Sequence, residues 1–175
     1  MNILVTGGLG FIGSNYINYI FHNDSKINRI INVDKFSYCS SKNYIDSEVA
    51  NSNKYNFFKL NISNKQSVYK ILDKYNINRV VNFAAYSHVD NSIKNPNKFI
   101  RSNISSFNDF IETCYRYWVK KRKNNFKFIH ISTDEVFGSS SNSKNFFNEK
   151  SNYNPSSPYS SSKASTDFIL NAYNH

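Results

Sequence analysis

Residues 6–13 read TGGLGFIG, and this stretch decides the fold. The run before it, residues 2–6 (NILVT), is apolar and partly β-branched, which predicts a buried strand. The run after it, residues 11–21, carries apolar side chains at helical spacing. A glycine turn between a strand and a helix lets backbone N–H groups approach a pyrophosphate at the helix N-terminus. Gly7, Gly10 and Gly13 are therefore the candidate glycines of a dinucleotide site.

An acidic residue at the end of the next expected strand sharpens this prediction. Residues 29–33 (RIINV) read as a strand, and Asp34 follows it 21 residues after Gly13. A carboxylate at this place suits the hydroxyls of an adenosine ribose and repels a 2′-phosphate, so NAD is expected in preference to NADP. The neighbouring Lys35 works against that preference.

Strand-like and helix-like runs alternate along the rest of the chain. We expect further strands at 56–60, 79–84 and 126–132, helices at 65–75, 96–118 and 159–175, and a loop at 139–158. The helix at 96–118 is expected to bury Phe99, Ile100, Asn103, Ile104, Phe107, Phe110, Ile111 and Cys114. This alternation predicts an α/β fold, a doubly wound parallel sheet of the Rossmann type, with ligands at the carboxyl ends of the strands. We expect one domain over residues 1–175.

Composition excludes several classes of protein. With 39% hydrophobic and 17% aromatic residues, the 175-residue chain is not expected to be disordered. No apolar run approaches the ~20 residues of a membrane span, and the N-terminus lacks the features of a signal peptide. Cys39 and Cys114 form neither a CxxC pair nor a disulfide framework, so we expect a reducing, cytoplasmic compartment. The net charge is +10, but the lysines are scattered apart from residues 120–123, so no nucleic-acid partner is expected.

Two further motifs carry chemistry. Tyr159 and Lys163 stand at i and i+4, on one helical face, and the ammonium is expected to lower the phenol pKa so that Tyr159 acts as a base. Residues 132–138 (STDEVFG) place Thr133, Asp134 and Glu135 at the carboxyl end of an expected strand, where substrates bind. Either motif alone could be a surface pair or a polar turn, but both occur together with the glycine turn.

With these motifs, the sequence resembles the extended short-chain dehydrogenase/reductases, and among them the nucleotide-sugar 4,6-dehydratases, most closely the dTDP-glucose 4,6-dehydratases. The matching segments are TGGLGFIGS, NVDKFSY, VVNFAAYSHVDNSI, RYW, HISTDEVFG and PSSPYSSSKASTDF. The resemblance implies NAD-dependent dehydration of dTDP-glucose or UDP-glucose to the 4-keto-6-deoxy sugar, towards deoxysugar (rhamnose-type) biosynthesis.

The resemblance also implies residue roles. Tyr159, supported by Lys163, would be the base at the sugar 4-hydroxyl. Thr133 would bond the C4 oxygen, Glu135 would take the C5 proton, and Asp134 would protonate the leaving C6 hydroxyl. The implied cofactor contacts are Gly7, Gly10, Phe11, Ile12, Gly13, Asp34, Lys35, Phe36, Ser37, Asn61, Ile62, Phe83, Ala84, Ala85, Ser87, Ser102, Tyr159 and Lys163. Ser87 and Thr133 would also touch the substrate. His88 lacks partners at ligand spacing, so no metal is expected.

The sequence departs from the family pattern in several places. Asn61 and Asn64 stand where the family usually has aspartates, and Tyr86 stands where the bacterial pattern has glutamate, which leaves dTDP-glucose and UDP-glucose both open. The family continues into a C-terminal substrate domain that these 175 residues lack, so activity of this chain alone is open. A UDP-sugar 4-epimerase and a catalytically inactive NAD-binding fragment are the alternatives. Resembling enzymes pair two helices across a two-fold axis, which implies a homodimer through 96–118 and 159–175.

Overall fold

A computed structural model of the chain describes residues 1–122, 124–139 and 146–174. These residues form two compact units. The first, which we call the sheet unit, comprises residues 1–84 and 109–131, and the second, the helix unit, comprises 85–108 and 132–175. The expectation of one domain stays a prediction.

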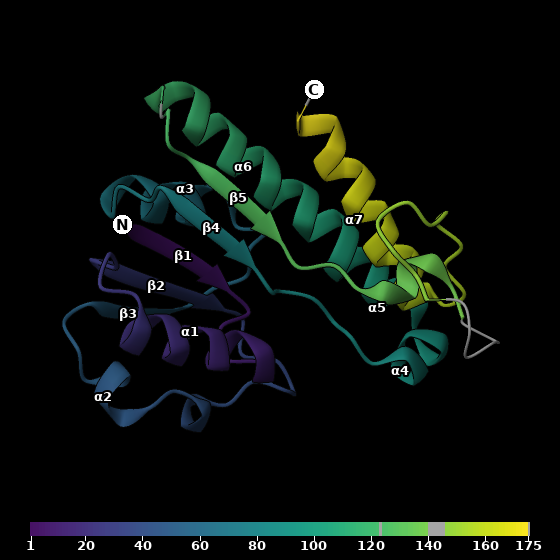
Figure 1. The fold of residues 1–175 in the computed structure, drawn as a ribbon, viewed down its shortest axis with the longest axis horizontal. Coiled ribbons are helices and arrows are strands. Elements are labelled where there is room, and N and C mark those ends of the chain that lie inside the picture. Colours follow the sequence, from purple (N-terminus) through teal and green to yellow (C-terminus); the bar gives the residue numbers. More distant parts are fainter. Residues whose placement is uncertain (123, 140–145, 175) are drawn as a thin grey trace. The chain divides into compact units, whose positions relative to one another are not determined.

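The sheet unit is built on five parallel strands (Figure 1). They are β1 (Asn2–Thr6), β2 (Arg29–Asp34), β3 (Tyr55–Lys59), β4 (Arg79–Asn82) and β5 (Lys127–His130), in the order β3-β2-β1-β4-β5. All four pairings are parallel. The chain runs outward from β1 in one direction and then returns to continue from β4 in the other, so the doubly wound parallel sheet is confirmed.

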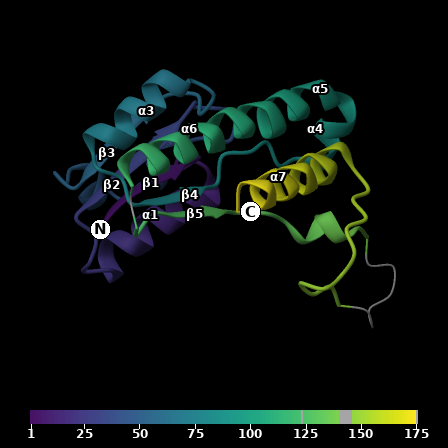
Figure 2. The same ribbon diagram turned by 90° about the horizontal axis from the view of Figure 1, so that it is seen from above.

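Helices cover both faces of this sheet. Figure 2 shows α3 (Lys65–Lys74) and α6 (Ser106–Lys121) on one side and α1 (Phe11–Asn23) on the other. Because successive side chains of a strand point to opposite faces, Leu4 packs in a core with α3 and α6, whereas Ile3 and Val5 pack in a second core with α1. Apolar residues in succession are therefore what a parallel sheet buried on both faces requires. A 3₁₀ turn (Lys42–Tyr44) and α2 (Ser47–Ala50) precede β3.

The expected strands agree with the observed ones to within two residues. β4 and β5 are shorter than expected, ending at Asn82 and His130. Hydrogen bonding continues past both ends, because Phe83 N–H donates to the Thr6 carbonyl over 3.0 Å and Ile131 N–H donates to the Asn82 carbonyl over 3.1 Å. The chain leaves the sheet gradually, which accounts for the difference.

The helix unit contains α4 (Val89–Lys94), α5 (Pro96–Phe99), a π-helical segment (Ile100–Ser105), the first residues of α6, a 3₁₀ turn (Asp134–Phe137) and α7 (Pro158–Asn174). Sequence patterning did not predict α4. The long helix expected at 96–118 begins at Pro96 as predicted and runs to Lys121, but its middle, Ile100–Ser105, is π-helical. A π turn contains more residues than an α turn, which shifts the faces of the helix, so Ile100 is 46% exposed rather than buried. Asn103 is buried as expected.

The structure describes part of the expected loop, both cysteines and the character of the helices. Residues 146–157 of the expected 139–158 loop contain neither helix nor strand, whereas 140–145, Lys123 and His175 lie outside the described residues. Cys39 is exposed, Cys114 is buried, and both are free thiols. Among the described helices, none combines the length and apolar character that a membrane crossing needs.

Candidate active site

The glycine turn is held by close backbone packing within the sheet unit. Gly7 has φ +69°, and a Cβ on it would lie 2.7 Å from the Ala84 nitrogen. A Cβ on Gly13 would lie 2.4 Å from the Gly7 oxygen, and one on Gly8 would lie 2.3 Å from Oδ1 of Asn32. Side chains at these three positions would therefore collide with the fold itself. Sequence reasoning missed Gly8, whose constraint comes from a buried side chain on β2.

Gly10 differs from the other glycines of the turn. A Cβ there would meet its nearest atom, the Gly7 oxygen, at 3.3 Å, and the backbone conformation is extended. Gly10 is the N-cap of α1 and has no side chain with which to cap it. The first N–H groups of a 13-residue helix therefore point out of its positive end, beside Phe11 and Ile12, which are 75% and 64% exposed. An uncapped, glycine-lined helix end fits the pyrophosphate of a dinucleotide.

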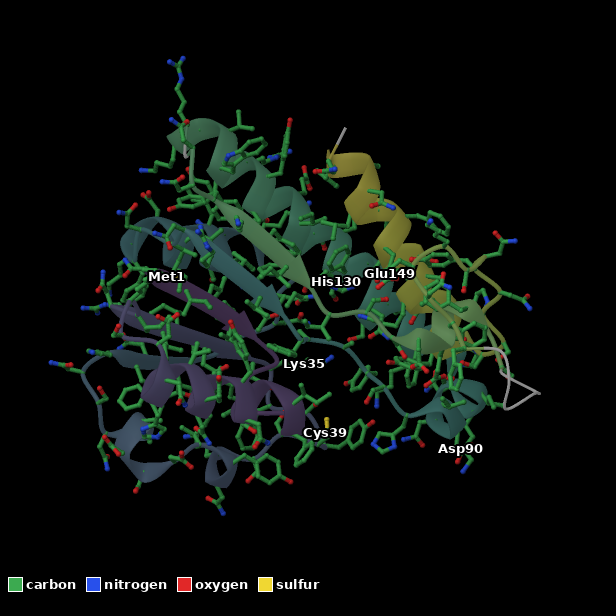
Figure 3. The ribbon with its side chains drawn as sticks, in the orientation of Figure 1. Met1, Lys35, Cys39, Asp90, His130 and Glu149 are labelled. Atoms are coloured by element: carbon green, nitrogen blue, oxygen red, sulfur yellow. The ribbon has the colours of Figure 1, made fainter. Side chains whose placement is uncertain are left out.

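Asp34 ties this turn to the loop after β2. Its carboxylate accepts from Leu9 N–H at 3.1 Å, Phe36 N–H at 2.7 Å and the Ser40 hydroxyl at 3.0 Å, and the residue is only 6% exposed. Phe36 adopts the left-handed conformation, with φ +63°. The expected ribose ligand is thus also a structural anchor of the site. Lys35, half-buried, and Cys39 lie beyond the carboxyl ends of the strands (Figure 3).

The other expected cofactor residues of the sheet unit follow strands β3 and β4. Oδ1 of Asn61 accepts from Ser63 N–H at 3.2 Å, and Ile62 is buried in the core, so the adenine contact of Ile62 would be made by its backbone. Phe83 packs its ring 5.3 Å from that of Tyr16. Ala84 forms the close backbone contact with Gly7.

In the helix unit, the 3₁₀ turn and α7 bring four expected catalytic residues together. Thr133 is the N-cap of the turn and accepts from Glu135 N–H at 3.3 Å. Its hydroxyl donates to Asp134 at 3.4 Å and also shares a hydrogen bond with the Tyr159 phenol. The charges of Glu135 and Asp134 both act on Tyr159. A hydroxyl, a phenol and two carboxylates thus form one cluster.

The ionisation of this cluster differs from the expectation. Burial is the main cause that raises the pKa of Tyr159; the Thr133 hydrogen bond opposes it, and Glu135 and Asp134 add to it. The net shift of the Tyr159 pKa is therefore upward, opposite to the lowering that the Tyr–Lys spacing predicts. Burial lowers the pKa of Lys163 to about 8, against the opposing charge of Asp167, and Lys163 is only 3% exposed. Burial and the charge of Asp134 raise the pKa of Glu135.

A buried asparagine positions the segment that carries the remaining expected contacts, Ala85, Ser87 and Ser102. Tyr86 N–H donates to Oδ1 of Asn103 at 2.8 Å, and Nδ2 of Asn103 donates to the Tyr86 carbonyl and to the Ser162 hydroxyl, both at 2.9 Å. Asn103 follows Ser102 in the π-helical segment. Sequence reasoning placed Asn103 on the buried face but missed this role. Ser87 is exposed.

His88 is the N-cap residue of α4 and is exposed. Across residues 1–122, 124–139 and 146–174, no three His, Cys, Asp or Glu side chains are grouped so that they could hold a metal ion.

A parallel Rossmann sheet with a glycine turn, and a helix carrying Tyr159 and Lys163, define the class of short-chain dehydrogenase/reductases. Within that class, the chain belongs to the GDP-mannose 4,6-dehydratase family, whose sequence model matches residues 4–175.

Individual relatives are similar over nearly the whole chain. The dTDP-glucose 4,6-dehydratase of Haemophilus influenzae is 42% identical over 176 residues, covering 99% of this chain and 51% of the relative. The crystal structure of the Bacillus anthracis dTDP-glucose 4,6-dehydratase in complex with NAD is 35% identical, with a TM-score of 0.82, over 99% of this chain and 50% of that one. The Campylobacter jejuni UDP-Glc/GlcNAc 4-epimerase is 29% identical, with a TM-score of 0.83, over 99% and 49%. The chain spans about half the length of these relatives.

Proposed function

We propose that this chain is the cofactor-binding and catalytic portion of an NAD-dependent nucleotide-sugar 4,6-dehydratase. Its reaction converts dTDP-glucose or UDP-glucose to the 4-keto-6-deoxy sugar. The observation that carries the proposal is the cluster of Thr133, Asp134, Glu135 and Tyr159, in which the charges of two adjacent carboxylates act on a phenol. An epimerase that only oxidises and re-reduces C4 needs no such acid–base pair, whereas the loss of water needs both an acid and a base.

The proposed cofactor is NAD, bound by the glycine turn, by Asp34 and by Asn61. The uncapped N-terminus of α1 would hold the pyrophosphate, and Asp34 would accept from the ribose and disfavour NADP. When bound, the oxidised nicotinamide supplies a hydride acceptor for C4 and a positive charge. Because the pKa of Tyr159 stands above its ordinary value, positive charge from this ring and from Lys163 is what the phenol needs to act as a base.

The first half of the reaction is assigned to three residues. Tyr159 takes the proton of the sugar 4-hydroxyl as the C4 hydride leaves. Thr133, which shares a hydrogen bond with Tyr159, would also bond the C4 oxygen. Lys163 supports the negative charge that develops on the phenol. The product of this half-reaction is a ketone at C4, which acidifies the C5 proton.

The second half is assigned to the two carboxylates. Glu135 removes the C5 proton, and the raised pKa of this carboxylate makes it a stronger base than an ordinary one. Asp134 protonates the C6 hydroxyl, which departs as water. Loss of water leaves a C5=C6 double bond. C6 would then receive its hydride from the reduced cofactor, and the proton held by Glu135 would return to C5, which gives the 4-keto-6-deoxy sugar. Oxidation must come first, because a carboxylate cannot remove an unactivated sugar proton.

We also propose a homodimer and a cytoplasmic location. On α6, Tyr115, Trp118 and Val119 are 41%, 40% and 51% exposed, and on α7 Phe168 is 59% exposed. Exposed apolar side chains on helices are a property of surfaces that associate with a partner.

The proposal is tested by incubating the chain with NAD and either nucleotide sugar in deuterated water. The wild type should release a 4-keto-6-deoxy sugar labelled at C5. Tyr159→Phe should give no NADH signal, and Glu135→Gln should form NADH but exchange C5 ~10²–10⁴-fold more slowly. Asp134→Asn should keep more C5 exchange while losing turnover. An epimer as the product, or C5 exchange at the wild-type rate in Glu135→Gln, would overturn the assignment.

A further inference from the structure

Asp167 is a carboxylate of the helix unit for which the proposed mechanism has no use. It lies on α7, one turn after Lys163. One of its oxygens, Oδ2, accepts from the Ser132 hydroxyl at 2.5 Å and from the Tyr153 hydroxyl at 3.1 Å. A single carboxylate oxygen on the helix therefore joins two segments that are distant from it in sequence.

These two segments hold opposite ends of the 3₁₀ turn Asp134–Phe137, which we call the catalytic turn because it carries Asp134 and Glu135. Ser132 directly precedes Thr133 at the start of the turn. At the other end, the Tyr153 ring lies 5.4 Å from that of Phe137, and Asn154 N–H donates to the Val136 carbonyl at 2.9 Å. Gly138 closes the turn with φ +102°, where a Cβ would lie 2.7 Å from the Asn154 oxygen. Asp167 thus accepts a hydrogen bond from Ser132, which directly precedes the catalytic turn, and another from Tyr153, whose ring packs against that turn.

Asp167 also acts on the buried ammonium. Its charge raises the pKa of Lys163, opposing the larger lowering that burial causes. The elements packed against α7 carry other charged groups, namely Asp90 and Lys94 on α4, Lys98 on α5, Arg101 in the π-helical segment, and Asp134 and Glu135 in the 3₁₀ turn. Of these, Asp134 and Glu135 act on Tyr159.

We propose that Asp167 is a positioning residue with two separable tasks: its oxygen fixes the catalytic turn against α7, and its carboxylate, one helical turn after Lys163, offsets the charge of that buried ammonium. The role in turnover rests on the proposed function, whereas the role in the ionisation of Lys163 does not. Asp167 itself touches neither substrate nor reacting atoms in this assignment.

The two tasks are separated by two kinds of variant. Both hydroxyls donate to the same oxygen, so the amide oxygen of Asp167→Asn can still accept both hydrogen bonds while the charge is lost. The double variant Ser132→Ala/Tyr153→Phe keeps the charge and removes both donors. Asp90→Asn removes an exposed carboxylate from α4 (Figure 3) and is the control for net charge.

The first measurement is the titration of Lys163, followed by NMR of protein labelled at the lysine Cε, with the signal assigned by its loss in Lys163→Met. We expect a midpoint near pH 8 in the wild type, a lower midpoint in Asp167→Asn, and the wild-type midpoint in Asp90→Asn and the double variant. An unchanged midpoint in Asp167→Asn overturns the electrostatic task. If the Lys163 midpoint changed equally in Asp90→Asn, the change would come from the net charge of the protein and not from the nearby Asp167.

The second measurement is turnover of the nucleotide sugar against pH. In Asp167→Asn the fall in rate on the alkaline side should move to lower pH, with recovery in more acidic buffer. In the double variant kcat should fall at every pH, with the NAD dissociation constant unchanged. Wild-type kcat in the double variant overturns the tethering task. If no variant, including the wild type, binds NAD or forms product while the Lys163 midpoint still moves, the proposed function fails and the electrostatic task stands.

Discussion

The glycine turn of the sheet unit and the catalytic turn of the helix unit are sites of opposite construction. The glycine turn depends on residues without side chains, because Gly7, Gly8 and Gly13 let neighbouring atoms pack within distances that a Cβ would not permit. The site around the catalytic turn is proposed to work through ionisable side chains of that turn and of the neighbouring α7, whose proton affinities depend on burial. The first site is compatible with a stable fold, whereas the second buries an ammonium group and thereby costs stability.

The largest effect should come from Lys163→Met, which exchanges a buried ammonium for an apolar chain of similar length. Activity should fall by ~10²–10⁴ because the phenol loses its supporting charge. The fold should become more stable at neutral pH. The drop in the Lys163 pKa from 10.5 to about 8 corresponds to about 3 kcal/mol, at about 1.4 kcal/mol per tenfold change in equilibrium. Urea unfolding at neutral pH measures the gain.

The stability that Lys163→Met gains over the wild type should depend on pH. Between pH 8 and 10.5 the unfolded chain holds a proton on Lys163 that the folded chain has lost, so the free energy of unfolding should rise with pH across this window. Below pH 8 the cost of the charge is complete, and above pH 10.5 it is gone. The difference between wild type and Lys163→Met should shrink across this window. A constant difference would show that the ammonium is not destabilising.

The glycine turn offers the converse test, in which a methyl group is added at two positions. Gly13→Ala should lower the free energy of unfolding by ~1–3 kcal/mol, because the close approach to the Gly7 oxygen outweighs the gain in helix propensity of about 1 kcal/mol. Gly10→Ala should change stability by less than about 1 kcal/mol but weaken NAD binding at least about tenfold, since its methyl group would lie at the helix end proposed to bind the pyrophosphate.

Urea unfolding and NAD titration of both variants separate packing from binding. Equal losses of stability in the two variants would mean that Gly10 is as constrained by the fold as Gly13. Unchanged NAD affinity in a folded Gly10→Ala would remove the uncapped end of α1 from the binding site.

Local patterns in the sequence predicted the features that depend on local structure. Succession of Ile3, Leu4 and Val5 predicted a strand buried on both faces, and the glycine spacing predicted the turn. The π-helical segment could not be predicted from apolar spacing, because Ile100 fits an α-helical face equally well and only tertiary packing shifts the register. The raised pKa of Tyr159 is also non-local, since it depends on burial and on Glu135 and Asp134.

Residues that act through a long-range hydrogen bond gave no sequence signal. Asn103 bonds Tyr86 and Ser162, and Asp167 bonds Ser132 and Tyr153, partners that are 14 to 59 residues away. The spacing of apolar residues around Asn103 and Asp167 predicts only that each lies in a helix. The helix pattern placed Asn103 on the buried side, and the reason a polar side chain is tolerated there appears only when the partners are known.

The smallest expected effects separate binding from folding within a single turn of the sheet unit, where Asn61 and Asn64 both stand in place of family aspartates. Oδ1 of Asn64 caps α3 by accepting from Ser67 N–H at 3.1 Å, so Asn64→Asp should add about 0.5 kcal/mol of stability through the helix dipole and leave NAD affinity unchanged. Asn61 precedes the helix and is proposed to accept from the adenine. Because a carboxylate is a stronger hydrogen-bond acceptor than an amide, Asn61→Asp should strengthen NAD binding by about 1 kcal/mol, which is about fivefold in Kd. The free energy of unfolding should change little. Calorimetric titration and thermal unfolding of the two variants measure both quantities. If Asn64→Asp tightened NAD as much as Asn61→Asp, the gain would reflect the added charge of the turn, and Asn61 would lose its assignment as the adenine contact.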